Sequence, residues 1–296
     1  MSTFVGIDLG GTRLRAACSD GSGEPRPLGA TEPAPATTDA LRERIAARVD
    51  ETGGGVRAIG ITIPGLVDGT RCRWVPNLPH LDGIDLAELL SPLGVAVVAG
   101  NDAHLALLAE SILGAAVGVR DAVLVAIGTG IGSAVLCDGR IVRGSRSGAV
   151  SLGWATGDVR DPGHPRSGWL ERHASGRALD AAGAALDPPV DGRGLVDAAR
   201  AGDAAAVAGL RTVAEPLGVG LATSVALLDP EVVLLAGGVA DAIDVLGPLV
   251  SEAMDRRLPG HLRGTPLRAG TFGSRAGAVG AALAAQRGAL WWEVRA

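Results

Sequence analysis

Short apolar runs separated by glycine, proline and charged residues predict that strands and helices alternate along this chain. Compact apolar runs are typical of buried strands, and apolar residues that recur with helical spacing are typical of amphipathic helices. The expected strands lie at residues 4–8, 14–18, 56–63, 95–99, 122–127, 133–137, 140–142 and 232–235. The expected helices lie at residues 38–51, 103–113, 170–186, 194–201, 203–228, 245–258 and 277–287. This alternation indicates an α/β fold with layered sheets.

A strand, a glycine-rich turn and a second strand follow one another twice, near residue 8 and near residue 128. We interpret this as a coarse internal duplication. Asp138-Gly139 also predicts a tight hairpin turn. Residues 151–168 are rich in Gly, Pro, Asp and Arg, so we expect a loop there.

The composition is that of a protein with a large core, because 47% of the 296 residues are hydrophobic. The net charge is −5 and no basic stripe is present, so nucleic acid is not an expected partner. No apolar run approaches the ~18 residues of a membrane-spanning helix. The N-terminus shows no signal-peptide pattern. We therefore expect a cytoplasmic protein without a membrane partner.

The first glycine turn, Asp8-Leu9-Gly10-Gly11-Thr12, follows a carboxylate at the end of a strand. The backbone N–H groups of Gly10 and Gly11, with the Thr12 hydroxyl, can hold an anion such as phosphate. Asp8 can position Mg²⁺ or its water shell, because Mg²⁺ prefers a few carboxylates together with substrate phosphates. An ordinary hairpin turn is the alternative.

The second turn, Gly128-Thr129-Gly130-Ile131-Gly132, is another candidate for phosphate binding. It has no lysine and is followed by a strand, which argues against both P-loop and Rossmann nucleotide sites. A single glycine turn is weak evidence, but one such turn in each half of the chain is a more specific signal.

Polar or glycine residues also follow two other expected strands. Asp102 can accept a proton from a substrate hydroxyl, and Asn101 can orient a sugar by hydrogen bonds. A helix cap is the alternative for this pair. The strand at residues 232–235 leads into Gly237-Gly238, where the missing side chains would let a flat ligand approach the backbone. The alternative there is a simple turn between strand and helix.

Together these segments resemble the ROK family of sugar kinases and repressors, in the family's order and over nearly the whole chain. The matching segments are residues 6–12, 63–69, 76–78, 101–103, 128–132, 170–171 and 228–239. Repressor members carry an N-terminal winged helix, for which a first hairpin starting at residue 4 leaves no room. The resemblance therefore implies a kinase and not a DNA-binding protein.

The resemblance implies the actin-like ATPase fold, a ribonuclease H-like α/β fold with two domains and a central cleft. The expected small domain covers residues 1–104 and 277–296, with the catalytic base Asp102 at its edge. The expected large domain covers residues 105–276 and binds ATP with Mg²⁺, with the adenine near Gly237 and Gly238. The residues expected to contact the sugar are Asn77, Asn101, Asp102 and Glu171.

Two departures from the family pattern alter the expected sugar pocket and metal content. Many members carry Glu-x-Gly-His after the second turn, where this chain has Ser151-Leu152-Gly153-Trp154. We expect Ser151 and Trp154 to face the sugar. Trp154 and Trp169 either add aromatic surface or fill the volume left by a metal. The family's cysteine cluster is missing, and His164 and His173 alone make a poor zinc site, so we predict no zinc.

The expected reaction is ATP-dependent phosphorylation of the primary, 6-type hydroxyl of a hexose or hexose-like substrate, by a homodimeric enzyme. The altered pocket also suits an aminosugar or cyclitol of specialised metabolism, such as kanosamine. A catalytically weak sugar-sensing protein is an alternative of another class, which the retained Asp8 and Asp102 disfavour. Polyphosphate is an alternative phosphate donor, because related zinc-free kinases use it.

Overall fold

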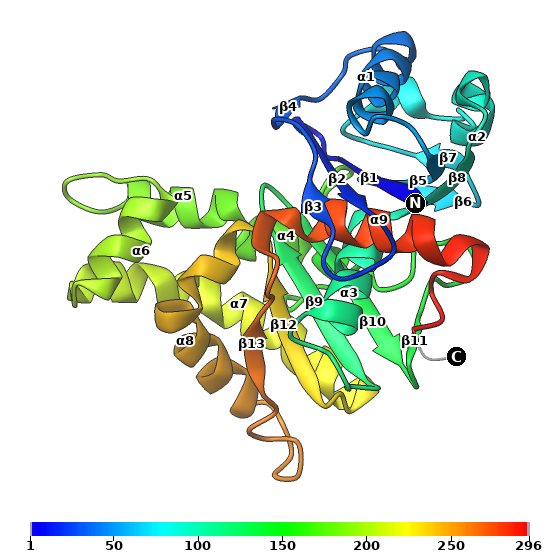
Figure 1. Ribbon diagram of the computed structural model, residues 1–296. Coiled ribbons are helices and arrows are strands. Elements are labelled where there is room, and N and C mark those ends of the chain that lie inside the picture. Colours follow the sequence, from blue (N-terminus) through cyan, green and yellow to red (C-terminus); the bar gives the residue numbers. More distant parts are fainter. Residues whose placement is uncertain (1, 295–296) are drawn as a thin grey trace. The chain divides into compact units, whose positions relative to one another are not determined.

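Two groups of residues pack separately in the computed structural model, which describes residues 2–294 (Figure 1). The first unit comprises residues 2–118, 139–149 and 274–294, and the second comprises residues 119–138 and 150–273. The first unit includes all of α3 (Asp102–Leu113), because this helix packs along α9 (Ala276–Arg287). These units are divided differently from the expected domains, whose boundaries at residues 104 and 276 stay a prediction.

The sheet of the first unit has the strand order β3-β2-β1-β5-β8, and β4 also pairs with β2. Its strands are β1 (Thr3–Leu9), β2 (Arg13–Ser19), β3 (Arg26–Pro27), β4 (Glu32–Pro33), β5 (Val56–Ile63) and β8 (Ala96–Asn101). β1 and β2 pair antiparallel around the first glycine turn, which confirms that predicted hairpin. β1, β5 and β8 are parallel and adjacent. Asp8, Thr62 and Gly100 therefore lie in register near the C-terminal ends of these three strands.

Helices and one further hairpin complete the first unit. These are α1 (Thr38–Glu51), α2 (Leu86–Leu89), α3, α9 and the hairpin of β6 (Leu66–Asp68) and β7 (Arg71–Trp74). α1 has the predicted bounds because Thr37 caps it: the Thr37 hydroxyl accepts a hydrogen bond from Ala40 N at 3.2 Å. The β6–β7 hairpin was not predicted, since its strands are too short to show a period.

α9 packs closely on this sheet, over β1 and β5, because glycines face it. A Cβ on Gly60 would overlap the carbonyl oxygen of Ala281, so even a methyl group has no room there. We therefore expect Gly60→Ala to lower the free energy of unfolding by about 1–3 kcal/mol, the usual cost of overpacking a tight core. Urea unfolding would measure the change.

The matched control is Gly260→Ala in the second unit. A Cβ on Gly260 would meet no heavy atom within 4 Å, and Gly260 is not among the glycines with positive φ. The control should unfold like the wild type. Equal stability of the Gly60→Ala protein and the control would contradict the close packing of α9 on the sheet.

The sheet of the second unit has the order β10-β9-β12-β13. Its strands are β9 (Ala122–Ile127), β10 (Ile131–Cys137), β12 (Val232–Ala236) and β13 (Leu267–Ala269). β9 and β10 pair antiparallel around the second glycine turn, as predicted. The predicted turn at Asp138-Gly139 is also confirmed, because both residues have positive φ (49° and 74°), and it leads into β11 (Arg140–Ile141).

Five helices pack on the sheet of the second unit or on one another. They are α4 (Trp169–Ala174), α5 (Gly176–Ala184), α6 (Gly192–Arg200), α7 (Ala204–Leu228) and α8 (Ile243–Asp255). The prediction of one continuous helix over residues 170–186 is wrong. The chain breaks at Ser175, because Gly176 N donates to the carbonyl of Gly128 (2.8 Å) instead of to a helical partner.

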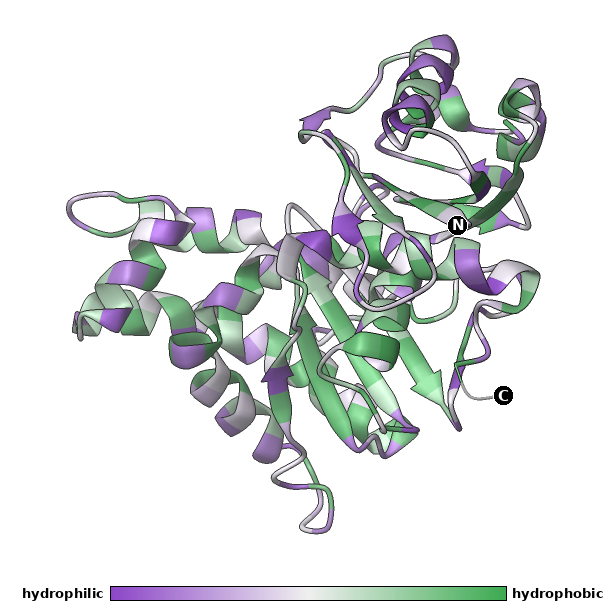
Figure 2. Ribbon diagram, in the orientation of Figure 1, coloured by the Kyte–Doolittle hydropathy of each residue, from purple (hydrophilic) through white to green (hydrophobic). Residues whose placement is uncertain are grey.

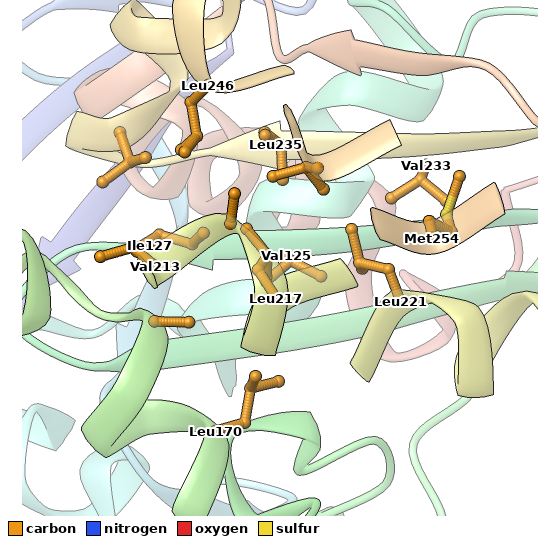
Figure 3. Packing of buried hydrophobic residues seen from close by; sticks show 14 of the residues in the cluster. Val125, Ile127, Leu170, Val213, Leu217, Leu221, Val233, Leu235, Leu246 and Met254 are labelled. Carbon is orange, nitrogen blue, oxygen red and sulfur yellow. The ribbon is translucent and has the colours of Figure 1, made fainter. Parts of the chain in front are cut away.

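The core of the second unit lies between this sheet and the long α7. Val125 and Val233 from the strands meet Leu217 and Leu221 from α7, with Met254 from α8 beside them (Figure 3). The strands of this sheet are mainly hydrophobic along their length, whereas helices such as α1 alternate hydrophobic and hydrophilic positions (Figure 2). This difference is expected for strands that are covered on both faces. Among residues 2–294, no helix combines the length and apolar character needed to cross a membrane.

Candidate active site

Asp8 is a partly buried carboxylate near the end of β1, held by two neighbours in the first unit. Thr62 Oγ1 donates to Asp8 Oδ1 (2.8 Å), and the Arg15 guanidinium lies 3.4 Å from Oδ2. Burial raises the pKa of Asp8, while Thr62 and Arg15 oppose that shift. A fixed carboxylate beside a glycine turn suits Mg²⁺, which uses one or two protein carboxylates and keeps water and phosphate oxygens as its other ligands.

Asn101 caps α3 and fixes the turn that precedes it. Its Oδ1 accepts hydrogen bonds from Ala103 N (3.0 Å) and His104 N (3.4 Å), and its Nδ2 donates to the Gly65 carbonyl (3.1 Å). The capping alternative is therefore confirmed for Asn101. Asp102 is the first residue of the helix and is not the cap.

The Asp102 carboxyl lies in a setting that disfavours its charge. The pKa of Asp102 is raised from 3.8 to about 6, mainly by burial and also by the nearby charge of Asp8, while the Ala103 N–H opposes the shift by donating to Oδ1 (2.8 Å). The group is still ionised at neutral pH. A base whose pKa lies near the working pH is well matched to proton transfer.

Asn77 lies beside the first glycine turn although 66 residues separate it from Gly11 in the chain. A Cβ on Gly11 would come within 2.8 Å of the Asn77 Cβ, so only glycine allows this approach. Asn77 is exposed, as is Thr12. The first unit thus brings together the predicted residues Asp8, Gly10, Gly11, Thr12, Asn77, Asn101 and Asp102.

The second glycine turn is open at Gly128, where a Cβ would meet no heavy atom within 4 Å. Glu171 is tied to this turn, because its Oε2 accepts a hydrogen bond from Ile131 N (3.1 Å). One carboxylate oxygen of Glu171 therefore holds the turn, a role that was not predicted. Contact of Glu171 with a sugar stays a prediction. The other predicted members of this turn, Thr129, Gly130 and Gly132, lie on the same hairpin.

The two glycines after β12 differ in whether the fold requires a glycine at their position. Gly237 has φ of 77°, and a Cβ there would approach the backbone of Ile127 on β9, so the fold itself demands glycine. Gly238 has no heavy atom within 4 Å of its Cβ position. Only Gly238 therefore offers the open backbone expected at an adenine site.

Ser151 is exposed and follows a strained residue. Val150 has φ of 61°, a left-handed conformation that β-branched residues rarely adopt. The buried Ser133 hydroxyl holds it, since Ser133 Oγ donates to the Val150 carbonyl and accepts from Leu152 N (3.0 Å). This role of Ser133 was not predicted, because its only signal in the sequence is its place on the strand after the glycine turn.

The two tryptophans near Ser151 have different surroundings. The Trp154 side chain is half-exposed (47%), so it does not fill an interior volume. Trp169 packs against the core and stacks on His173, with ring centroids 4.7 Å apart. Trp169 therefore fits the alternative in which a tryptophan fills the volume left by a metal. Trp154 fits the alternative in which a tryptophan adds aromatic surface.

The region expected to bind zinc in many relatives is held here by protein contacts. Arg172 pairs with Asp161 (2.6 Å), and His173 Nδ1 bonds to the Trp169 carbonyl (2.7 Å). Within residues 2–294, no group of three or more His, Cys, Asp or Glu side chains is arranged to hold a metal ion. A zinc-free protein stays our prediction.

Purified protein is expected to contain no stoichiometric zinc, and EDTA is expected to leave its melting temperature unchanged. The reason is that His164 Nδ1 already lies 3.1 Å from the Ser167 hydroxyl and that no thiolate lies in this loop. Elemental analysis and thermal unfolding would measure both. One zinc per chain would contradict the prediction and would indicate that His164 and His173 are zinc ligands.

Residues 4–287 match the model of the ROK family, so the chain belongs to this family. An N-acetylmannosamine kinase from Salmonella typhi is 32% identical over 292 residues, covering 96% of this chain and 98% of that protein. A ROK family glucokinase from Streptomyces griseus, solved with glucose and AMPPNP, is 28% identical with a TM-score of 0.81. That match covers 97% of this chain and 100% of the glucokinase chain.

A ROK hexokinase from Thermus thermophilus is 35% identical with a TM-score of 0.78, covering 96% of this chain and 98% of that chain. These structural matches confirm the actin-like ATPase fold predicted from the sequence. The family resemblance is confirmed as well. The roles of the individual site residues stay predictions.

Proposed function

We propose that this protein is an ATP-dependent sugar kinase that phosphorylates the primary, 6-type hydroxyl of a hexose-like substrate. The observation that carries the proposal is the Asp102 carboxyl at the start of α3, which is partly buried, interacts with the charge of Asp8 and has a pKa of about 6. The relatives support it, because they are named as kinases of glucose, hexoses and N-acetylmannosamine.

In the proposed reaction Asp102 accepts the proton of the sugar hydroxyl, and the hydroxyl oxygen forms a bond to the terminal phosphorus of ATP. The bond from that phosphorus to the bridging oxygen breaks, and its electrons leave with ADP. Such transfers depend on positioning and on offsetting negative charge more than on covalent chemistry. Asn101 contributes by holding the turn that carries Asp102.

The glycine turns at residues 10–12 and 128–132 are proposed to bind phosphate oxygens through backbone N–H groups. Asp8 is proposed to hold Mg²⁺ through its water shell, and the ion would offset phosphate charge when bound. The open backbone at Gly238 supports adenine binding there. The relative solved with AMPPNP, an ATP analogue, supports ATP as the phosphate donor.

For the sugar itself, we propose a hexose that carries an amino or acylamino group near C2 or C3, with a cyclitol as the alternative acceptor. Two features favour an altered substrate: Ser151 stands where the family resemblance implies a carboxylate, and the half-exposed Trp154 follows three residues later. The N-acetylmannosamine kinase relative acts on an acylamino sugar, as its name states. Losing a hydrogen bond to a charged group weakens binding of an unmodified hydroxyl by ~1–3 kcal/mol.

The test is phosphate transfer from ATP to glucose, N-acetylmannosamine, N-acetylglucosamine, kanosamine and inositol, with polyphosphate as a second donor. A modified sugar is expected to exceed glucose in kcat/KM, and Ser151→Glu should shift preference toward glucose. Glucose as the best substrate by a wide margin would contradict the modified-sugar proposal and leave sugar kinase activity intact. Phosphate transfer to none of these acceptors would contradict the kinase proposal itself.

A further inference from the structure

The last described residues, 291–294, run along residues 139–143 of the same unit. Ile141 N donates to the Trp292 carbonyl (2.9 Å), and Val294 N donates to the Gly139 carbonyl (3.0 Å). The Arg143 guanidinium lies 3.6 Å from the centre of the Trp292 ring, a cation–π contact. These contacts fix this C-terminal tail, residues 291–294, at several points.

Trp291 points away from this attachment and into the core of the first unit. Its side chain is 3% exposed, and its ring meets that of Trp292 edge to face, with centroids 5.9 Å apart. A Cβ on Gly100 would lie 2.9 Å from Trp291 Cζ2 and 2.9 Å from Leu105 Cγ. The indole therefore lies directly against the backbone of Gly100.

Gly100 ends the buried part of β8, and the next two residues are Asn101 and Asp102. Asn101 fixes this turn through its hydrogen bond to Gly65. Trp291 and Leu105 fill the space beside Gly100. The backbone that leads to the Asp102 carboxyl is thus held by contacts at two successive residues.

We propose that Trp291 is a positioning residue for Asp102, and that Trp292 holds Trp291 in place by anchoring the tail to residues 139–143. The proposal rests on the proposed function, in which Asp102 is the base. The match to the ROK family model covers residues 4–287, so the tail lies outside the matched range.

The test compares Trp291→Ala, Trp291→Phe and Gly100→Ala, with Leu290→Ala as the control. Leu290 directly precedes the tail and is 57% exposed, so its truncation should leave kinetics unchanged. Trp291→Ala is expected to lower kcat by roughly tenfold with KM for the sugar within about twofold, because small misplacements of a reacting group are costly. Trp291→Phe should recover most of the lost rate.

A double variant distinguishes positioning from general weakening. Gly100→Ala pushes a methyl group against the indole and against Leu105, and should also lower kcat by roughly tenfold. In Gly100→Ala with Trp291→Ala, the methyl group gains room on the side of the indole, so the two losses should not multiply. The double variant should retain about the rate of either single variant instead of losing about a hundredfold.

Two results would overturn the inference in an active wild-type enzyme. The first is an unchanged kcat in the folded Trp291→Ala and Gly100→Ala proteins, even if both melt earlier. The second is a fully multiplicative loss in the double variant. If Trp291→Ala does not fold, Trp291→Phe and Gly100→Ala carry the test alone. A wild type that transfers phosphate to no acceptor would instead overturn the proposed function, and the inference with it.

Discussion

Replacing Asp102 with asparagine is expected to lower kcat by ~10²–10⁴-fold, the usual contribution of a positioned general base. Asparagine keeps the size of the side chain and can still accept the hydrogen bond from Ala103 N, but it cannot take up a proton. Initial rates at saturating sugar and ATP would measure the loss. The loss should appear in kcat, because the ground-state contacts of the substrate remain.

The same substitution is expected to stabilise the protein above pH 6. A carboxyl whose pKa is raised from 3.8 to about 6 by burial contributes stability below its ordinary pKa and loses it as the pH rises through 6. One pKa unit corresponds to about 1.4 kcal/mol, and the side chain retains some access to water, so we expect a gain of about 1–3 kcal/mol at pH 7.5. Near pH 3.5 the gain should vanish.

Asp39→Asn is the matched control for both measurements. Asp39 is also a carboxylate in the first turn of a helix, but its side chain is 72% exposed. The control should keep the wild-type rate. A folded Asp102→Asn protein with near wild-type turnover would remove Asp102 from the mechanism.

Local patterns predicted the elements whose ends are set by local interactions. α1 and β5 have the predicted bounds, since Thr37 caps the helix and Pro64 follows the strand. Both glycine hairpins were predicted for the same reason, because glycine and polar residues mark a turn within a few positions. In each case the deciding contact is close in the sequence.

Elements whose limits depend on contacts between residues far apart in the sequence were not predicted. The break at Ser175 depends on the hydrogen bond from Gly176 N to the Gly128 carbonyl, 48 positions away. β13 has three residues and exists because it pairs with β12. The neighbourhood of Asn77 and Gly11 is also non-local. The spacing of hydrophobic residues along the chain does not predict such contacts. Asn77 was assigned to the site only from the family resemblance.

Rare residue types are a further signal in the composition of this chain. The chain has only two asparagines, Asn77 and Asn101, and both were assigned to the site. It has no lysine, so each of its basic side chains is an arginine. Residue types that are nearly absent elsewhere are informative where they remain. The tryptophans at residues 291 and 292 are a similar case, because five tryptophans are a large share of so few aromatics.

The reaction rate is expected to fall about tenfold for each pH unit below about 6, as Asp102 takes up a proton and stops acting as a base. Burial is the main cause of this high pKa, and the charge of Asp8 adds to it. Asp8 is the acidic neighbour that adds to the shift, and its own oxygens are bound by Thr62 and Arg15. kcat measured from pH 5 to 8.5 would give the midpoint.

The terminal phosphate of a nucleotide also titrates near pH 6, as other phosphate monoesters do. The residual rate of Asp102→Asn, measured over the same range, separates the two groups. A slope that persists in this variant belongs to the nucleotide, and a slope that disappears belongs to Asp102. A wild-type profile that stays flat down to pH 5 would contradict the raised pKa of Asp102, because a carboxyl of ordinary pKa stays ionised over this whole range.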